Sequence, residues 1–212
     1  RKSVMEFLLI NHPLDCPECD QAGECRLQNY SYTYGRDHGR FHEEKVVKSK
    51  ATMGPHVKYW GSRCIVCTRC VRFTDEVSGT GELGVIYRGD RSEIALFPGK
   101  TMDNPLSMNT VDICPVGALV SSDFLFQTRV WNLKSAPSLC SDCAVGCNTR
   151  VDFDAKGTIK RIVPRRNDKV NKDLKCDHGH LPFPYVKWNR ASKPLGDGKE
   201  RPTRDGPRTA SS

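Results

Sequence analysis

Apolar residues recur at helical spacing near the start of the chain. Val4, Phe7, Leu8 and, less regularly, Ile10 would lie on one face of an N-terminal helix. We expect this face to belong to a hydrophobic core. Pro13 follows and would end the helix, because proline lacks the amide hydrogen that a helix interior needs.

Two later segments alternate between apolar and polar positions and predict β-hairpins. The first is residues 82–97, with Gly89 and Asp90 in its turn region. The second is residues 149–164, which would turn at residues 154–157.

Two further segments predict helical structure next to cysteines. Residues 64–78 should begin as a turn and continue as a helix. A second helical segment is expected further along the chain, and it carries Val111, Ile113, Cys114, Ala118 and Leu119. Helices and hairpins in one chain predict an α+β fold.

The remaining segments are polar. Residues 35–50 predict a surface connection that contains His38 and His42, and exposed loop histidines are more often solvated than metal-bound. Residues 189–212 hold almost no apolar side chains and are expected to form an extended tail unless a partner binds them.

Composition argues against one large hydrophobic core. Only 37% of the 212 residues are apolar, with 13 prolines and 17 glycines. Such a chain favours small units in series, each held together by something other than apolar packing. No apolar run reaches the 18 residues of a membrane span, and the run Phe7–Ile10 is too short for the core of a signal peptide.

The eleven cysteines are the strongest chemical signal. They fall into tight groups, and the count reaches three sets of four only if His12 is included. The sets are His12, Cys16, Cys19 and Cys25; Cys64, Cys67, Cys70 and Cys114; and Cys140, Cys143, Cys147 and Cys176. An odd number of cysteines in C-x-x-C groups suits metal-bound thiolates in a reducing compartment better than disulfides.

Zinc and iron–sulfur clusters are the competing interpretations of these sets. Three cysteines with one histidine, or four cysteines, are ordinary zinc ligands, although zinc sites usually consist of two separated C-x-x-C pairs. The run C-x-x-C-x-x-C with a distant Cys-Pro, here Cys114-Pro115, is the pattern of a [4Fe–4S] cluster. We therefore predict three [4Fe–4S] clusters.

The ligand sets divide the chain into four segments. Residues 1–45 would form a helical unit with one histidine and three cysteine ligands. Residues 46–131 would form a mixed helix and hairpin unit with four cysteine ligands. Residues 132–188 would form a unit with four cysteine ligands that resembles the molybdopterin-oxidoreductase type, and residues 189–212 would form the tail.

Charge is consistent with bound clusters. The chain carries a formal charge of +8. Three clusters with these ligands contribute roughly −5, which leaves about +3. The basic run Lys160–Arg166 is interpreted as a solvated hairpin arm, and a zinc-stapled nucleic-acid-binding scaffold is kept as the alternative from a different class.

With these ligands placed, the chain resembles the large iron–sulfur subunit of respiratory complex I, the NADH:quinone oxidoreductase. The spacing H-x3-C-x2-C-x5-C is similar to that of the family's histidine-ligated cluster, and C-x2-C-x2-C-x43-C with CPVGAL is similar to that of its next cluster. The spacing C-x2-C-x3-C-x28-C resembles an extra cluster of many bacterial members, which favours a bacterial source.

The chain also departs from that family. The cysteines of the family's N-terminal [2Fe–2S] domain are absent, and so is its C-terminal molybdopterin-like domain. Pterin enzymes carry Lys-Gly-Arg close behind the fourth cysteine, where this chain has His178, Gly179 and His180. We therefore expect no molybdopterin and no [2Fe–2S] cluster in this chain.

The resemblance implies an electron-transfer subunit with no catalytic site of its own. Electrons would pass from the NADH/flavin subunit through the second and then the first cluster to a ferredoxin-like subunit with two [4Fe–4S] clusters, and on to the quinone module. The third cluster would support structure and lie off this path. The implied location is the peripheral arm, on the cytoplasmic face of a bacterial inner membrane. An NAD-linked hydrogenase or formate dehydrogenase subunit is the alternative within the class.

Overall fold

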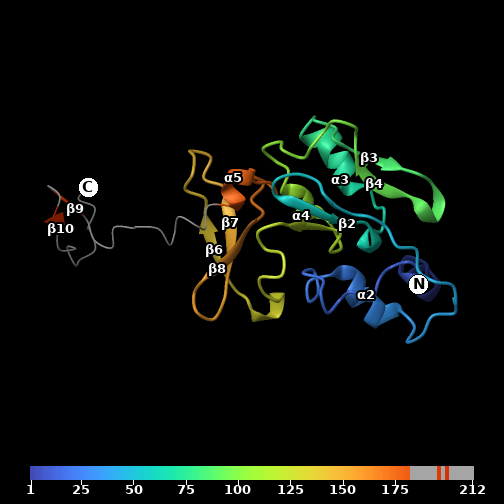
Figure 1. Cartoon of the computed structure of the whole chain (residues 1–212). Helices are drawn as coiled ribbons and strands as arrows, with labels where there is room; N and C mark the ends of the chain where they lie inside the picture. The colour runs from blue at the N-terminus through green and yellow to red at the C-terminus, as the bar shows by residue number, and fades with distance from the viewer. Residues whose placement is uncertain (182–194, 197–198, 201–212) are drawn as a thin grey trace.

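A computed structural model describes residues 1–181, 195–196 and 199–200. Helices and small antiparallel sheets alternate along this part of the chain, which confirms the α+β class (Figure 1). Most of the expected polar tail, and residues 182–188 of the third unit, lie outside the described residues. Within the tail, β9 (Leu195–Gly196) pairs antiparallel with β10 (Lys199–Glu200).

The N-terminal helix is present, but its expected buried face is partly wrong. Helix α1 spans Lys2–Leu9, and α2 spans Arg26–Tyr34. Val4 is 62% exposed and Phe7 is 75% exposed, whereas Met5 is buried. The helix contacts the core along a narrow stripe of Met5, Leu8 and Leu9, so that Val4 and Phe7 point to the other side.

The central part of the chain contains a sheet that the sequence pattern did not predict. Strands β1 (Lys50–Thr52), β2 (Val57–Trp60) and β5 (Leu119–Ser121) form an antiparallel sheet in the order β1-β2-β5. Leu119 was expected in a helical segment but pairs with Tyr59 as the first residue of β5. The strands are only three or four residues long, which is too short for alternation to be recognised.

Other elements of the central part agree with expectation. Strands β3 (Leu83–Ile86) and β4 (Glu93–Leu96) form the hairpin, joined through the 3₁₀ turn η3 (Gly89–Arg91). Helix α3 (Arg69–Arg72) follows the cysteine turn and continues into the π-helical turn η2 (Phe73–Val77). Helix α4 (Asn109–Ile113) carries Val111 and Ile113 but ends before Cys114, and Ala118 lies in a turn, so the expected helical segment is confirmed only in its first part.

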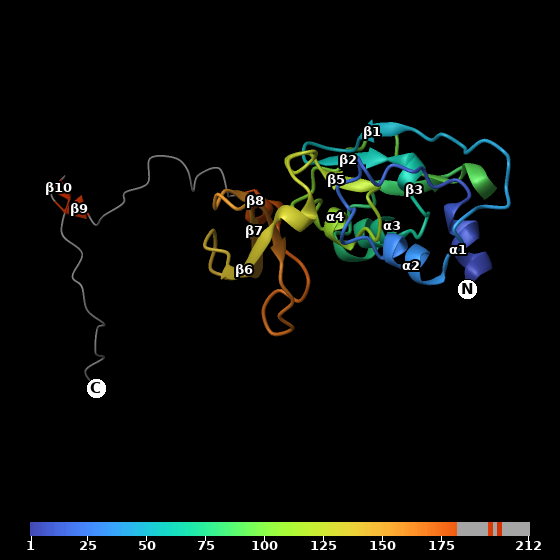
Figure 2. The same ribbon diagram turned by 90° about the horizontal axis from the view of Figure 1, so that it is seen from below.

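The third part is a three-stranded antiparallel sheet with a short helix beside it. The order is β6 (Lys134–Leu139), β7 (Asn148–Phe153) and β8 (Ile159–Pro164), and β7 and β8 form the expected hairpin. Short turns η1 (Gly61–Arg63) and η4 (Val130–Asn132) precede the second and third cysteine groups, and helix α5 is Asp177–His180. Both views place this sheet beside the central part, away from helix α1 (Figures 1 and 2).

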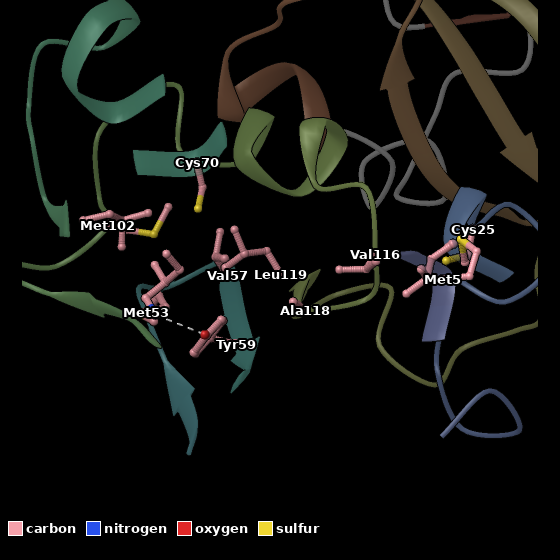
Figure 3. Close-up of a cluster of buried hydrophobic side chains, with 13 residues drawn as sticks. Met5, Cys25, Met53, Val57, Tyr59, Cys70, Met102, Val116, Ala118 and Leu119 are labelled. Carbon is pink, nitrogen blue, oxygen red and sulfur yellow. Dashed lines mark hydrogen bonds between the residues drawn. The ribbon is translucent and has the colours of Figure 1, made fainter. Parts of the chain in front are cut away.

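One hydrophobic core joins the first two units. Met53, Val57 and Tyr59 pack with buried residues from the hairpin and with Val116, while Met5 and Cys25 extend the same core into the first unit (Figure 3). The hydroxyl of Tyr59 accepts a hydrogen bond from the backbone amide of Ile94, at 3.3 Å (Figure 3). Packing thus fixes the positions of the first and second cysteine groups relative to each other.

Polar contacts attach the third unit to the other two. The guanidinium of Arg161 donates two hydrogen bonds to the carboxylate of Glu24, at 2.7 and 2.8 Å. The side-chain amide of Asn109, in the second unit, donates to the carbonyl of Lys175 at 2.6 Å. Residues 160–166 were expected to form a solvated basic arm. This expectation is wrong for Arg161, whose side chain is only 17% exposed.

No helix in the described part of the chain is long and apolar enough to cross a membrane.

Candidate metal centres

The second set of cysteines surrounds a pocket between α3, β2 and the 114–119 segment. Cys64, Cys67, Cys70 and Cys114 all line it, together with apolar side chains such as Ile94. Burial and the neighbouring thiols raise the pKa of Cys70 to about 12, and burial raises that of Cys114 to about 11. Buried thiols of this kind are poor nucleophiles, because the thiolate is the reactive form; a bound metal would deprotonate them.

The backbone between these cysteines adopts a strained conformation. Val66 and Thr68 have φ angles of 52° and 59°, in the left-handed region that β-branched residues avoid. Each costs about 1–3 kcal/mol, and such residues concentrate at functional sites. The turn brings the amide of Val66 to 3.3 Å from Cys64 Sγ. The chain therefore curls around the pocket, as a ligand loop must.

The first set lines a second, larger pocket. His12, Cys16, Cys19 and Cys25 border a space of about 600 Å³ that reaches from α1 to the 35–45 connection. Burial and the charges of Cys25 and Cys16 raise the pKa of Cys19.

His12 has the environment of a metal ligand. Its Nδ1 atom is buried and has no hydrogen-bond partner within residues 1–181. Burial, and then the positive charge of Lys45, lower the pKa of His12. The imidazole is thus held neutral with a nitrogen available, which is the form that binds metals.

One turn of the chain separates the two pockets. Pro115, Val116 and Ala118 line the second pocket, whereas Gly117 lines the first. A Cβ atom on Gly117 would collide with Cys19 Sγ, so only glycine lets the turn approach the first set this closely. The two candidate sites therefore share a wall one chain thick.

The third set is brought together by the loop between β6 and β7 and by the start of α5. The amide of Cys140 donates to the carbonyl of Cys147 at 2.8 Å. Burial, followed by the charges of Cys140, Cys176 and Cys143, raises the pKa of Cys147. All four predicted ligands thus lie close enough to interact.

A buried lysine beside the third set was not identified from the sequence. Lys175 is 2% exposed, and its ammonium donates to the carbonyls of Ile162 (3.0 Å) and Gly179 (2.7 Å). Burial lowers its pKa to about 8, while Asp112 and the thiols Cys140 and Cys176 act in the opposite direction. It lies immediately before Cys176, whereas the lysine of pterin enzymes lies behind the fourth cysteine, so the resemblance gave no sign of it.

The contacts of two further residues were not predicted from the sequence. Arg63 is buried next to the first pocket, and His180 links the second and third units. The Nε2 atom of His180 lies 2.8 Å from Asp112 Oδ2. Its Nδ1 atom lies 3.0 Å from the carbonyl oxygen of Cys176. No spacing pattern marks either residue.

His38 is exposed and pairs with Asp37.

All eleven cysteines are free. Among the described residues, no three or more histidine, cysteine, aspartate or glutamate side chains are arranged to hold a single metal ion. The first and second sets each border a pocket.

Comparisons with known proteins point to one family. Residues 54–120 match the family model described as NADH-quinone oxidoreductase subunit 3, ferredoxin-like domain. Residues 1–40 match the NADH-ubiquinone oxidoreductase-G iron-sulfur binding region. The chain is 44% identical to an NADH-quinone oxidoreductase subunit of Rickettsia conorii over 92% of its own length. The chain is a homologue of this subunit.

Mitochondrial relatives match equally well. The chain is 46% identical to NADH dehydrogenase [ubiquinone] iron-sulfur protein 1 of Solanum tuberosum, over 94% of its length. It is also 46% identical to the NADH-ubiquinone oxidoreductase 78 kDa subunit of Neurospora crassa, over 95%. The chain spans between 27% and 29% of the length of these relatives. A bacterial source stays a prediction.

A solved structure shares part of the fold. The chain is similar to a chain of an NAD⁺-reducing [NiFe]-hydrogenase in the H₂-reduced state, with a TM-score of 0.54 and 28% identity. The match covers 61% of this chain and 57% of the hydrogenase chain. This likeness is weaker and shorter than the match to the NADH-quinone oxidoreductase homologues.

Proposed function

We propose that the chain carries electrons between [4Fe–4S] clusters within a respiratory complex I. One cluster would be held by each of the three ligand sets named above, and each would staple one unit, residues 1–45, 46–131 and 132–188. Bound clusters supply reversible one-electron transfer at each site. The chain itself would hold them, exclude water and set their potentials.

The shared wall between the first two pockets is the observation that carries this proposal. The Pro115–Ala118 turn contacts both pockets, and Cys25 Sγ lies 3.8 Å from the carbonyl of Pro115. Electron tunnelling falls steeply with distance, so a relay needs sites that are this close. Two structural zinc sites would need no such proximity.

The partners follow from this function. Electrons would enter the second cluster from the NADH/flavin subunit, pass to the first cluster, and leave to a ferredoxin-like subunit and the quinone module. The chain would then lie in the peripheral arm, on the cytoplasmic face if the source is bacterial. The apolar side chains exposed on α1, Val4 and Phe7, offer surface for contact with another subunit or domain.

Matched cysteine variants in the assembled complex test the relay. Cys67→Ser should abolish NADH:quinone turnover normalised to flavin, because it removes a cluster on the path. Cys143→Ser should lower the amount of assembled complex, while complexes that assemble keep their turnover. Equal loss of turnover per assembled complex in both variants would contradict the off-path place of the third cluster. Unchanged turnover in Cys67→Ser would contradict the relay.

A subunit of an NAD-linked hydrogenase or formate dehydrogenase is the second candidate. The likeness to the NAD⁺-reducing hydrogenase chain favours it over unrelated functions. Both candidates use the clusters in the same way and differ in the terminal partner. Purification under mild detergent distinguishes them: quinone-module subunits support complex I, and a nickel–iron or formate-oxidising subunit supports the alternative.

A further inference from the structure

Arg63 is a buried cation beside the first candidate site. It is 1% exposed and lines the same pocket as His12, Cys16, Cys19 and Cys25. It comes from η1, the turn that leads into Cys64, so it belongs to the second unit by sequence and faces the ligand set of the first.

The hydrogen bonds of Arg63 are incomplete. Its Nε donates to Asp15 Oδ2 at 3.0 Å, and its guanidinium lies 5.2 Å from the ring centroid of Trp60. The Nη1 group is buried and has no partner among residues 1–181. Burying a charged donor without an acceptor is costly, so such a group indicates an acceptor that the protein residues do not supply.

The positive charge of Arg63 has a single, partly exposed counter-charge. Asp15 is the only anion that contacts Arg63 within the described residues, and its side chain is 35% exposed.

We propose that the free N–H of Arg63 donates a hydrogen bond to sulfur of the cluster held by His12, Cys16, Cys19 and Cys25, and that it raises the reduction potential of this cluster. Reduction adds one electron and hence one negative charge to the site. No bond breaks, and Arg63 keeps all its protons. A fixed cation and donor stabilise the more negative state, as hydrogen bonds to cluster sulfur generally do. The inference rests on the proposed function and assigns Arg63 as a positioning and potential-setting residue.

The test compares Arg63→Met and Arg63→Lys with Arg166→Met in the anaerobically purified full chain. Arg166 is a suitable control because its side chain is 67% exposed and pairs with Asp168, which is also exposed. Redox titration followed by EPR should show a first-cluster potential at least about 59 mV more negative in Arg63→Met, which is a tenfold shift in the reduction equilibrium. Arg63→Lys should shift the potential less, and Arg166→Met should not shift it.

A second readout separates a hydrogen bond from a structural role. With ¹⁵N-arginine incorporated, pulsed EPR of the reduced first cluster should show ¹⁵N coupling that is lost in Arg63→Lys, which keeps the charge and much of the bulk. Absence of this coupling in the wild-type chain, or an unchanged potential in Arg63→Met with normal iron content, would overturn the inference. Absence of a first cluster from the wild-type chain would instead overturn the proposed function.

Discussion

Arg161 should stabilise both the hairpin of the third unit and the contact of this hairpin with the loop of the first candidate site. Its guanidinium bonds Glu24 twice, at 2.7 and 2.8 Å, and Asp152 Oδ2 once, at 2.7 Å. It also lies 4.8 Å from the ring centroid of Phe124. Glu24 immediately precedes the predicted ligand Cys25, so the contact bears directly on the loop of the first candidate site.

The magnitude follows from burial. Asp152 is 1% exposed on its side chain, and in Arg161→Met it would lose one of its two arginine partners. Removing one member of a buried ion pair costs about 3–5 kcal/mol. Ser135 and Arg150 still bond Asp152, and Glu24 is 27% exposed, so it regains water. We therefore expect Arg161→Met to lower the free energy of local opening by the lower limit, about 3 kcal/mol. This corresponds to a roughly hundredfold larger equilibrium constant for opening of these segments.

Hydrogen exchange of the cluster-loaded chain measures this directly. Amides of residues 16–26 and 148–164 should exchange about a hundredfold faster in Arg161→Met. Arg166→Met is the matched control, because Arg166 is 67% exposed and pairs with exposed Asp168. A surface pair contributes at most about 1 kcal/mol. Equal exchange rates in the two variants would show that Arg161 does not stabilise these segments.

The pH dependence has a defined sign. Burial raises the pKa of Asp152, but hydrogen bonds from Ser135, Arg150 and Arg161 outweigh it and bring the value below the ordinary 3.8. A carboxyl group with a lowered pKa stabilises the fold above its unfolded pKa and loses that contribution as the pH falls through the folded value. The effect of Arg161→Met should thus stay constant from about pH 8 to about pH 6.

Two further variants test the first site. His12→Ala should remove or labilise the first cluster and leave the iron of the other two, as judged by iron analysis and EPR; full iron content with an unchanged spectrum would show that His12 is no ligand. Gly117→Ala should also prevent assembly of the first cluster, because the added methyl group meets Cys19 Sγ, whereas Gly39→Ala, which has no atom within 4 Å of the added Cβ, should load normally. Equal iron content in the two glycine variants would contradict the shared wall.

Much of the architecture could be predicted from local patterns. The hairpins at residues 82–97 and 149–164 have long alternating runs and clear turn residues, and both are present. The sheet of β1, β2 and β5 was missed because its strands are three or four residues long and β5 lies far from the others in sequence. Val4 and Phe7 were wrongly expected in the core, because spacing gives the helix face but not its width.

The candidate sites also contain residues that the sequence predicts and residues that only the fold reveals. Cysteine spacing proposes the ligand sets, since each set is mostly local in sequence. Arg63 and Gly117 act through contacts with residues distant in sequence. Lys175 and Arg63 are buried, but in the sequence a buried charge looks like any other charge. Only the folded chain reveals that Arg63 faces His12 across 51 positions, or that Gly117 limits the space around Cys19.

The central claim is that the twelve predicted ligands hold three cubanes. Iron and acid-labile sulfide, determined on the anaerobically purified chain, measure this most directly. About twelve irons and twelve sulfides per chain are expected, with broad visible absorption that bleaches on reduction. Stoichiometric zinc in a colourless protein, or iron for only two clusters with all twelve ligands intact, would contradict it.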